Sequence, residues 1–262
     1  MKWPQHKEFD IKERTILLGY VGSIAHGTSI FPKEGGLDDK DLMGVLIPPK
    51  EYYFGLRRKD ISGIFGEKYE PFEQWTGYID EYDITIYTIR KFVRLLLKSN
   101  PNVLSLLWLS PNHYVSVTEA GRVLLDNRNI FSSKLIYQSF VGYAYGQLKR
   151  MTHFEFFGYM GKKRKELVDK FGFDLKNGAH LIRILRMGIE FLISGELNVQ
   201  RYDAAQLIDI KQGKYSLEKI KEMAEDLFKK AEEAYLKSTL PNKPNCAKAE
   251  KMLIDIVSSR MN

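Results

Sequence analysis

The chain has 262 residues, a length that suits two modest domains of roughly 100–200 residues each. It carries 40 Lys and Arg against 33 Asp and Glu, and the resulting net charge of +7 weakly favours a polyanionic partner such as nucleic acid. A single cysteine, Cys246, excludes an intramolecular disulfide and a cysteine-rich zinc site. No signal-peptide core and no run of roughly 18 apolar residues is present, so we expect a cytoplasmic protein that does not enter the membrane.

The first part of the chain is rich in strand patterns. Apolar and β-branched residues predict strands at Thr15–Tyr20, Leu42–Ile47 and Tyr82–Ile89. Residues 50–80 mix aromatic side chains with glycines and charges, and we interpret them as short strands and loops. Those aromatic rings could stack on a nucleobase, although packing is their more common use.

Helical periodicity dominates from residue 117 onward. Pro101 can open a helix at its first turn, and Thr118 and Ser216 stand where helix N-caps are expected. Further helices are expected at residues 133–151, 163–170, 176–194, 204–210, 217–237 and 247–259. The sequence therefore predicts an α+β fold, with a mixed sheet and flanking helices followed by an all-helical part.

Two carboxylates stand at the start of the second predicted strand. Asp39 and Asp41 are spaced i, i+2, so they face the same side, while Lys40 faces the other. Adjacent carboxylates repel unless a cation lies between them, and Mg²⁺ prefers such oxygen ligands. A third carboxylate, Asp83, opens the later strand. Taken alone, such a cluster is more often a solvated acidic loop, and Asp38 is expected to be a supporting or solvent-facing charge.

The first strand ends in a turn of small residues. Gly22 and Gly27, followed by Thr28, have the spacing of a phosphate-binding P-loop. The P-loop lysine is missing, because Thr28 occupies its place, and this argues against a P-loop ATPase. A tight strand-to-helix turn would explain the glycines equally well.

Cationic residues of the helical part form a second candidate constellation. Lys176, His180 and Arg183 are spaced i, i+4, i+7 and therefore share one helix face. This face could bind the phosphates of a nucleoside triphosphate or of a nucleic-acid backbone, or it could simply be solvated.

The densest basic run lies just before that helix. It consists of Lys162, Lys163, Arg164 and Lys165. The run is either an ordinary solvated helix end or an electrostatic track for nucleic acid.

Gly-Ser, then Asp-x-Asp, then a later Asp is a pattern that resembles the DNA polymerase beta-like nucleotidyltransferase superfamily. Within it, residues 22–28 (GSIAHGT) and 39–45 (DKDLMGV) are similar to the RNA-repair-pathway group of bacteria and phages. The resemblance continues through KNGAHLIR at 176–183 and covers about residues 15–245. One departure is the loop Phe31–Leu37, which is longer than in the family, with Asp38 in place of a serine.

The resemblance implies an enzyme that moves a nucleoside monophosphate from an NTP to an acceptor hydroxyl and releases pyrophosphate. Residues 1–118 would form a minimal nucleotidyltransferase catalytic domain and residues 119–262 an α-helical domain, with the active site in the cleft between them. The implied acceptor is an RNA 3′ end, such as that of a tRNA, in RNA repair or modification.

The resemblance also implies roles for the residues that match the family's motif. Two Mg²⁺ ions, for which Mn²⁺ could substitute, would be held by Asp39, Asp41 and Asp83, and these three carboxylates would be catalytic. The NTP, for example ATP, would be bound by Gly22, Ser23, Lys176, His180 and Arg183. The RNA would be bound by Lys162, Lys163, Arg164 and Lys165.

Two other interpretations stay open. Enzymes of this architecture also modify proteins, as in antitoxins that adenylylate their toxin, or small molecules such as aminoglycosides. A different class would be a nucleic-acid-binding module without catalytic activity. The presence of all three carboxylates, Asp39, Asp41 and Asp83, argues against the inactive module.

Overall fold

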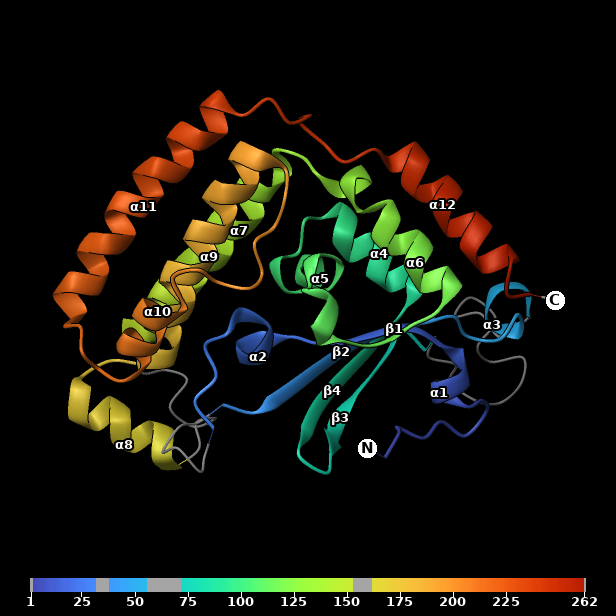
Figure 1. Ribbon diagram of the computed structural model, residues 1–262, viewed down its shortest axis with the longest axis horizontal. Helices are drawn as coiled ribbons and strands as arrows, with labels where there is room; N and C mark the ends of the chain where they lie inside the picture. Colours follow the sequence, from blue (N-terminus) through green and yellow to red (C-terminus); the bar gives the residue numbers. More distant parts are fainter. Residues whose placement is uncertain (1, 32–37, 56–71, 153–161, 262) are drawn as a thin grey trace, which may run out of the picture.

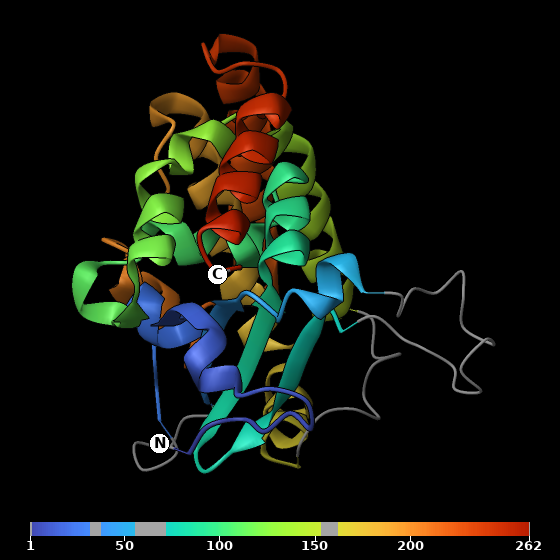
Figure 2. The ribbon, with the colours of Figure 1, turned by 90° about the vertical axis from the view of Figure 1, so that its right-hand side faces the viewer.

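The computed structural model describes residues 2–31, 38–55, 72–152 and 162–261. Within these ranges, helices and a single sheet form a broad arch, with the strands below and the long helices above and to one side (Figures 1 and 2). No helix in the described part of the chain combines the length and apolar character needed to cross a membrane.

The sheet has five strands in the order β3-β4-β2-β1-β5. β2 and β4 run parallel, and the other neighbouring pairs run antiparallel, so the sheet is mixed, as the sequence predicts. The strands are β1 (Thr15–Tyr20), β2 (Lys40–Leu46), β3 (Gln74–Ile79), β4 (Tyr82–Thr88) and β5 (Tyr114–Val117).

Helices surround and extend the sheet. They are α1 (Ile11–Arg14), α2 (Gly22–His26), α3 (Glu51–Phe54), α4 (Ile89–Leu97), α5 (Pro101–Ser105), α6 (Glu119–Asp126), α7 (Leu135–Thr152), α8 (Lys162–Phe171), α9 (Leu175–Ser194), α10 (Ala204–Lys211), α11 (Leu217–Lys237) and α12 (Cys246–Ser258). Short 3₁₀ segments are η3 (Leu106–Trp108), η4 (Pro111–His113) and η5 (Arg128–Phe131).

Several helix ends follow from local capping chemistry. The side chain of Thr118 accepts a hydrogen bond from the N–H of Gly121 and begins α6, as predicted. Pro101 stands in the first turn of α5, where its missing N–H costs nothing. Asp174 begins α9 by accepting from the backbone N–H groups of Lys176 and Asn177.

The two faces of the sheet bury different apolar clusters. The smaller cluster contains Leu18, Leu42 and Ile84, and the N-terminal segment packs on it through Trp3. The larger cluster includes residues of β1 and β2 and extends through the helices that cover the other face into α7, α9 and α11. The sheet and the helical part therefore share one continuous core, which fixes their relative placement around the cleft.

The observed elements confirm most of the sequence prediction. β1 and α11 have the predicted bounds, and the other predicted strands and helices shift by one or two residues at one or both ends. β5 was not predicted as a strand, because it is only four residues long and its pairing with β1 joins distant parts of the chain. Residues 32–37 of the lengthened loop Phe31–Leu37 and the aromatic residues Phe65 and Tyr69 lie outside the described residues.

The last strand ends at Val117, and Thr118 begins the first of the later helices. A domain boundary at residue 118 stays a proposal, because the shared core runs across it.

Candidate active site

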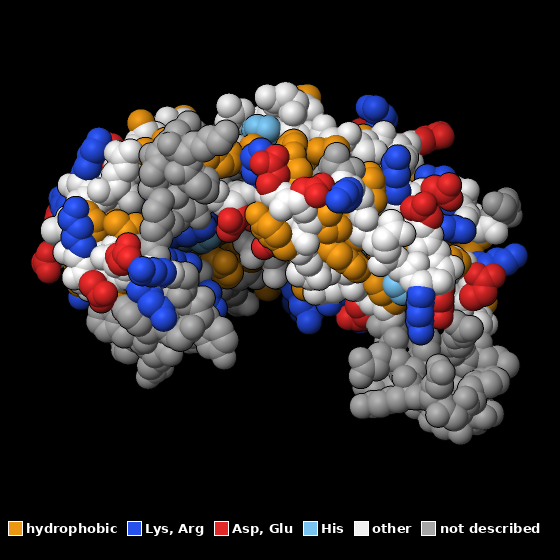
Figure 3. Space-filling model, turned by 90° about the horizontal axis from the view of Figure 1, so that it is seen from below, with side chains coloured by type: hydrophobic (Ala, Val, Ile, Leu, Met, Phe, Trp, Pro, Cys, Tyr) orange, Lys and Arg blue, Asp and Glu red, His pale blue; other side chains and the backbone are white. Residues whose placement is uncertain are grey.

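A cavity of about 320 Å³ opens between the sheet and the helical part. Seen from below, the surface is hollowed between these two parts, and acidic and basic side chains meet at the hollow (Figure 3). The cavity is lined by Val21, Gly22, Ser23, His26, Thr28, Asp38, Asp41, Leu42, Met43, Asp83, Thr85, Tyr87, Asn102, Ser105, Tyr143, Lys176, Ala179, His180, Arg183, Leu207 and Lys211.

Two of the predicted carboxylates form the sheet wall of this cavity. Asp41 on β2 pairs in parallel register with Asp83 on β4, so their side chains leave the sheet on the same side. Burial raises the pKa of Asp41 to about 6, and the negative charges of Asp83 and Asp39 add to the rise, whereas Lys176 opposes it. Asp39 lies one residue before β2, is exposed and is not part of the cavity wall.

Asp41 and Asp83 suit a divalent cation, although the third predicted carboxylate does not join them in one metal site. Among the described residues, no group of three or more His, Cys, Asp or Glu side chains lies close enough to hold a metal ion. The carboxylates of Asp41 and Asp83 nevertheless offer hard oxygen ligands whose mutual repulsion a cation would relieve. Participation of Asp39 as a third ligand stays a prediction.

The Gly-Ser turn packs directly against this pair. Gly22 has φ +62°, and a Cβ added there would lie 2.0 Å from Oδ2 of Asp41. Glycine is thus required both by the backbone conformation and by the contact. The Ser23 hydroxyl is buried and has no hydrogen-bond partner in the described structure, so it is available to a ligand.

The opposite wall is cationic. Lys176, His180 and Arg183 all line the cavity from α9, as their spacing predicts, while their role in nucleotide binding stays a prediction. Burial lowers the pKa of Arg183 to about 10, so the side chain remains charged at neutral pH. Burial and the charge of Arg183 hold the pKa of His180 well below its usual value, so this ring is neutral.

Lys211 on α10 completes the cationic wall, although the sequence analysis did not predict it as a site residue. Its Nζ donates to the backbone O of Thr28 at 2.7 Å and lies 2.8 Å from Oδ2 of Asp38. Burial lowers the pKa of Lys211, and the attraction of Asp38 offsets this only in part. No local motif marks Lys211, because its contacts lie far away along the chain.

Asp38 is a buried supporting charge, so its alternative assignment as solvent-facing is wrong. Only 4% of Asp38 is exposed, and its carboxylate also accepts from the N–H of Ile30 at 2.9 Å and lies 3.4 Å from Nζ of Lys176. Burial raises the pKa of Asp38, but Lys211, Ile30 and Lys176 outweigh this and hold it below its usual value. Asp38 therefore ties the loop before β2 to α9 and α10.

The basic run at the start of α8 is not uniformly available for nucleic acid. Lys162 is exposed, but the Arg164 guanidinium donates to Oδ2 of Asp174 at 2.6 and 3.0 Å and so holds the cap of α9. Lys165 is half-buried, and the side chain of Lys163 lies outside the described residues. RNA binding by the run stays a prediction, with Arg164 also serving the fold.

A mixed sheet that presents paired aspartates beside a Gly-Ser turn defines a nucleotidyltransferase of the polymerase beta type. The chain belongs to the RNA repair pathway DNA polymerase beta family, whose model matches residues 4–255. No match is found among curated proteins. Among solved structures, a nucleotidyltransferase-like protein from Exiguobacterium sibiricum 255-15 is similar at 11% sequence identity, with a TM-score of 0.28, over 94% of this chain and 70% of that one.

Proposed function

We propose that the cavity catalyses transfer of a nucleoside monophosphate from an NTP to an acceptor hydroxyl, with release of pyrophosphate. One observation carries the proposal. Asp41 and Asp83 lie side by side on one wall of the cavity, and Lys176, Arg183 and Lys211 line the other wall. Carboxylates on one wall and cations on the other match the needs of a reaction that moves phosphate groups past bound divalent cations. The family also supports this reaction class.

Each wall has a separate task in this proposal. Lys176, Arg183 and Lys211 supply positive charge to the triphosphate, and the unpartnered hydroxyl of Ser23 donates to a phosphate oxygen. Asp41 and Asp83 would hold Mg²⁺ or Mn²⁺, and these ions, when bound, lower the pKa of an acceptor hydroxyl and neutralise pyrophosphate.

Asp83 is the carboxylate that an acceptor reaches first. It is exposed, whereas Asp41 is half-buried beneath the Gly22 turn. An acceptor hydroxyl entering from the open side therefore meets Asp83, which can receive its proton or orient it. Asp41 lies deeper, next to the cations that would hold the departing phosphates.

We further propose that the acceptor is the 3′ end of an RNA, such as a tRNA. The description of the family, an RNA repair pathway family, supports an RNA acceptor. The net charge of +7 and the hollow between the two parts of the molecule also suit a polyanionic acceptor.

The acceptor is tested by incubating the protein with Mg²⁺ and each NTP labelled at the α-phosphate, in the presence of total RNA. We expect label in RNA, and none in RNA whose terminal 3′ hydroxyl has been replaced by hydrogen. Label on protein would instead support the adenylylating type. Salt-sensitive RNA binding without any label would support the inactive module and contradict the proposal.

A further inference from the structure

Arg183 is a buried arginine that forms no ion pair with a carboxylate within the described part of the chain, although Asp203 attracts its charge from farther away. Only 6% of the residue is exposed, and its Nη1 donates to Nε2 of His26 at 2.6 Å and to Sδ of Met187 at 3.4 Å. Arg201, by contrast, forms ion pairs with Glu190 and with a second carboxylate. A buried charge without a counterion is costly unless a ligand supplies one.

The partner of Arg183 is a histidine whose tautomer follows from its contacts. His26 Nδ1 lies 2.8 Å from the backbone O of Val199, and a carbonyl can only accept, so Nδ1 carries the proton. The Arg183 guanidinium can only donate, so Nε2 of His26 must offer its lone pair. His26 is therefore neutral, in keeping with burial and nearby charges of Arg183, Arg201 and Lys211, which hold its pKa well below the usual value.

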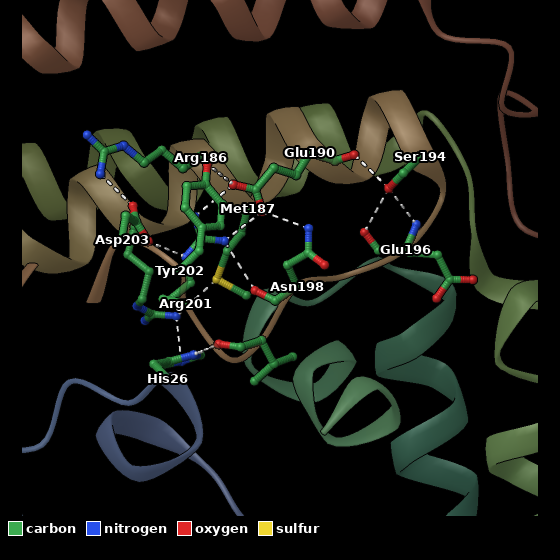
Figure 4. A network of polar contacts seen from close by, with 12 residues as sticks. His26, Arg186, Met187, Glu190, Ser194, Glu196, Asn198, Arg201, Tyr202 and Asp203 are labelled. Atoms are coloured by element: carbon green, nitrogen blue, oxygen red, sulfur yellow. Dashed lines mark hydrogen bonds and ion pairs between the residues drawn. The ribbon is translucent and has the colours of Figure 1, made fainter. Parts of the chain in front are cut away.

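The connection between α9 and α10 holds His26 in place from both sides. Val199 accepts from its ring, and the backbone N–H of Arg201 donates to the backbone O of His26 at 3.2 Å. Arg201 is in turn fixed to α9, because its guanidinium donates to both carboxylate oxygens of Glu190 at 2.6 and 2.7 Å. Figure 4 shows His26 on α2 facing this network. The turn that carries Ser23 is thus locked to α9.

We propose that His26 is a positioning residue that orients the Arg183 guanidinium toward the phosphates of the bound nucleotide, an inference that rests on the proposed function. An arginine side chain is long and flexible, so holding it in one orientation before the ligand binds reduces the entropic cost of binding. A carboxylate in place of His26 would hold the guanidinium as well, but it would also cancel the charge that a phosphate needs. A neutral imidazole holds Arg183 and leaves its positive charge available.

The first test measures equilibrium binding of inorganic tripolyphosphate and of each NTP, without acceptor. His26→Phe removes the acceptor atom and should weaken binding of both by roughly tenfold or more, the usual worth of a hydrogen bond to a charged group. His26→Gln, which can accept from Arg183 and donate to Val199, should restore most of the affinity. Melting temperatures of each variant verify that the protein is folded.

A double-mutant cycle shows whether His26 acts through Arg183. In an Arg183→Met background, His26→Phe should cause no further loss of tripolyphosphate affinity. An equal loss in both backgrounds, or unchanged affinity of the single variant, would overturn the inference. If the unsubstituted protein bound no NTP at all, the proposed function would fail, and the inference with it.

The third readout needs no substitution. The ¹⁵N chemical shifts of the imidazole in the unsubstituted protein should show a protonated Nδ1 and an unprotonated Nε2 for His26, with no titration between pH 5 and 8. A proton on Nε2, or titration in that range, would overturn the inference even if the protein transfers nucleotides as proposed.

Discussion

Asp41 and Asp83 are neighbours in the parallel pair of β2 and β4, and the backbone of Gly22 presses against the carboxylate of Asp41. The register of the sheet therefore holds the two negative charges close together although they repel each other. Burial and this repulsion raise the pKa of Asp41 to about 6, which makes the pair destabilising until a cation binds.

Replacing Asp41 should stabilise the metal-free protein while abolishing transfer. Because the pKa of Asp41 is raised from 3.8 to about 6, the folded state binds the proton more tightly than the unfolded state. The free energy of unfolding therefore falls as pH rises from about 4 to about 6, by on the order of 1–3 kcal/mol. Asp41→Asn should remove this fall, and Mg²⁺ should stabilise only the unsubstituted protein. Melting curves at several pH values, with and without Mg²⁺, measure both effects.

One outcome of these melting curves would contradict the described repulsion between Asp41 and Asp83. If the difference in melting temperature between the unsubstituted protein and Asp41→Asn stays constant from pH 4 to pH 7 without divalent cations, Asp41 and Asp83 do not repel as described.

Two glycines that flank α2 provide a matched pair of substitutions. Gly22 and Gly27 have φ +62° and +68°, so alanine at either position introduces similar backbone strain of about 1–2 kcal/mol. A Cβ at Gly22 would collide with Asp41, whereas at Gly27 the nearest atom is 3.9 Å away. Both variants should therefore melt at lower temperatures, with the larger drop for Gly22→Ala because of the added collision, but only Gly22→Ala should lose most of its kcat/KM. Equal activity of the two folded variants would show that the Gly22 contact does not matter for catalysis.

Local patterns in the sequence predicted the parts of the site that lie close together along the chain. The alternation of strand residues placed Asp41 at the cavity, and helical spacing placed Lys176 and Arg183 on one face of α9. Lys211 and His26 depend on contacts between segments far apart in sequence, and no periodicity reports such contacts. Prediction therefore succeeded within each element and failed where the tertiary fold brings elements together.

Removing one partner of the buried ion pair between Asp38 and Lys211 should cost far more stability than removing one partner of an exposed pair of similar length. Removing its carboxylate by Asp38→Asn leaves a buried lysine with a weaker partner and should cost roughly 3 kcal/mol. The pair between Asp209 and Lys214 has a similar N–O distance, 2.7 Å against 2.8 Å, but is exposed, so Asp209→Asn should cost less than about 1 kcal/mol. Denaturant unfolding of both variants tests the comparison.

The same pair has a defined pH dependence. The pKa of Asp38 is held below its usual value, so its stabilising contribution is present above pH 3.8 and is lost as pH falls further. Asp38→Asn should therefore flatten the acid limb of the stability curve. An unchanged acid limb would mean that Lys211 does not stabilise the Asp38 charge.

Substitutions at Lys162 and Arg164 should distinguish the role of the basic run in RNA binding from its role in folding. Lys162→Ala should leave the melting temperature unchanged, weaken RNA binding and reduce the salt slope of the binding constant by about one unit. Arg164→Gln removes the bond to Asp174 that caps α9, so it should lower the melting temperature. RNA affinity that is independent of salt and unaffected by Lys162→Ala would exclude this residue from the RNA-binding surface.

The most direct test of nucleotidyl transfer at Asp41 and Asp83 follows where the α- and γ-phosphates of the NTP go. The protein is incubated with Mg²⁺, an RNA carrying a 3′ hydroxyl, and an NTP labelled either at the α- or at the γ-phosphate. If Asp41 and Asp83 serve nucleotidyl transfer, the α label appears in the RNA, the γ label appears in pyrophosphate, and Asp83→Asn abolishes both signals while remaining folded. Appearance of the γ label in the acceptor, or undiminished transfer by Asp83→Asn, would contradict the account.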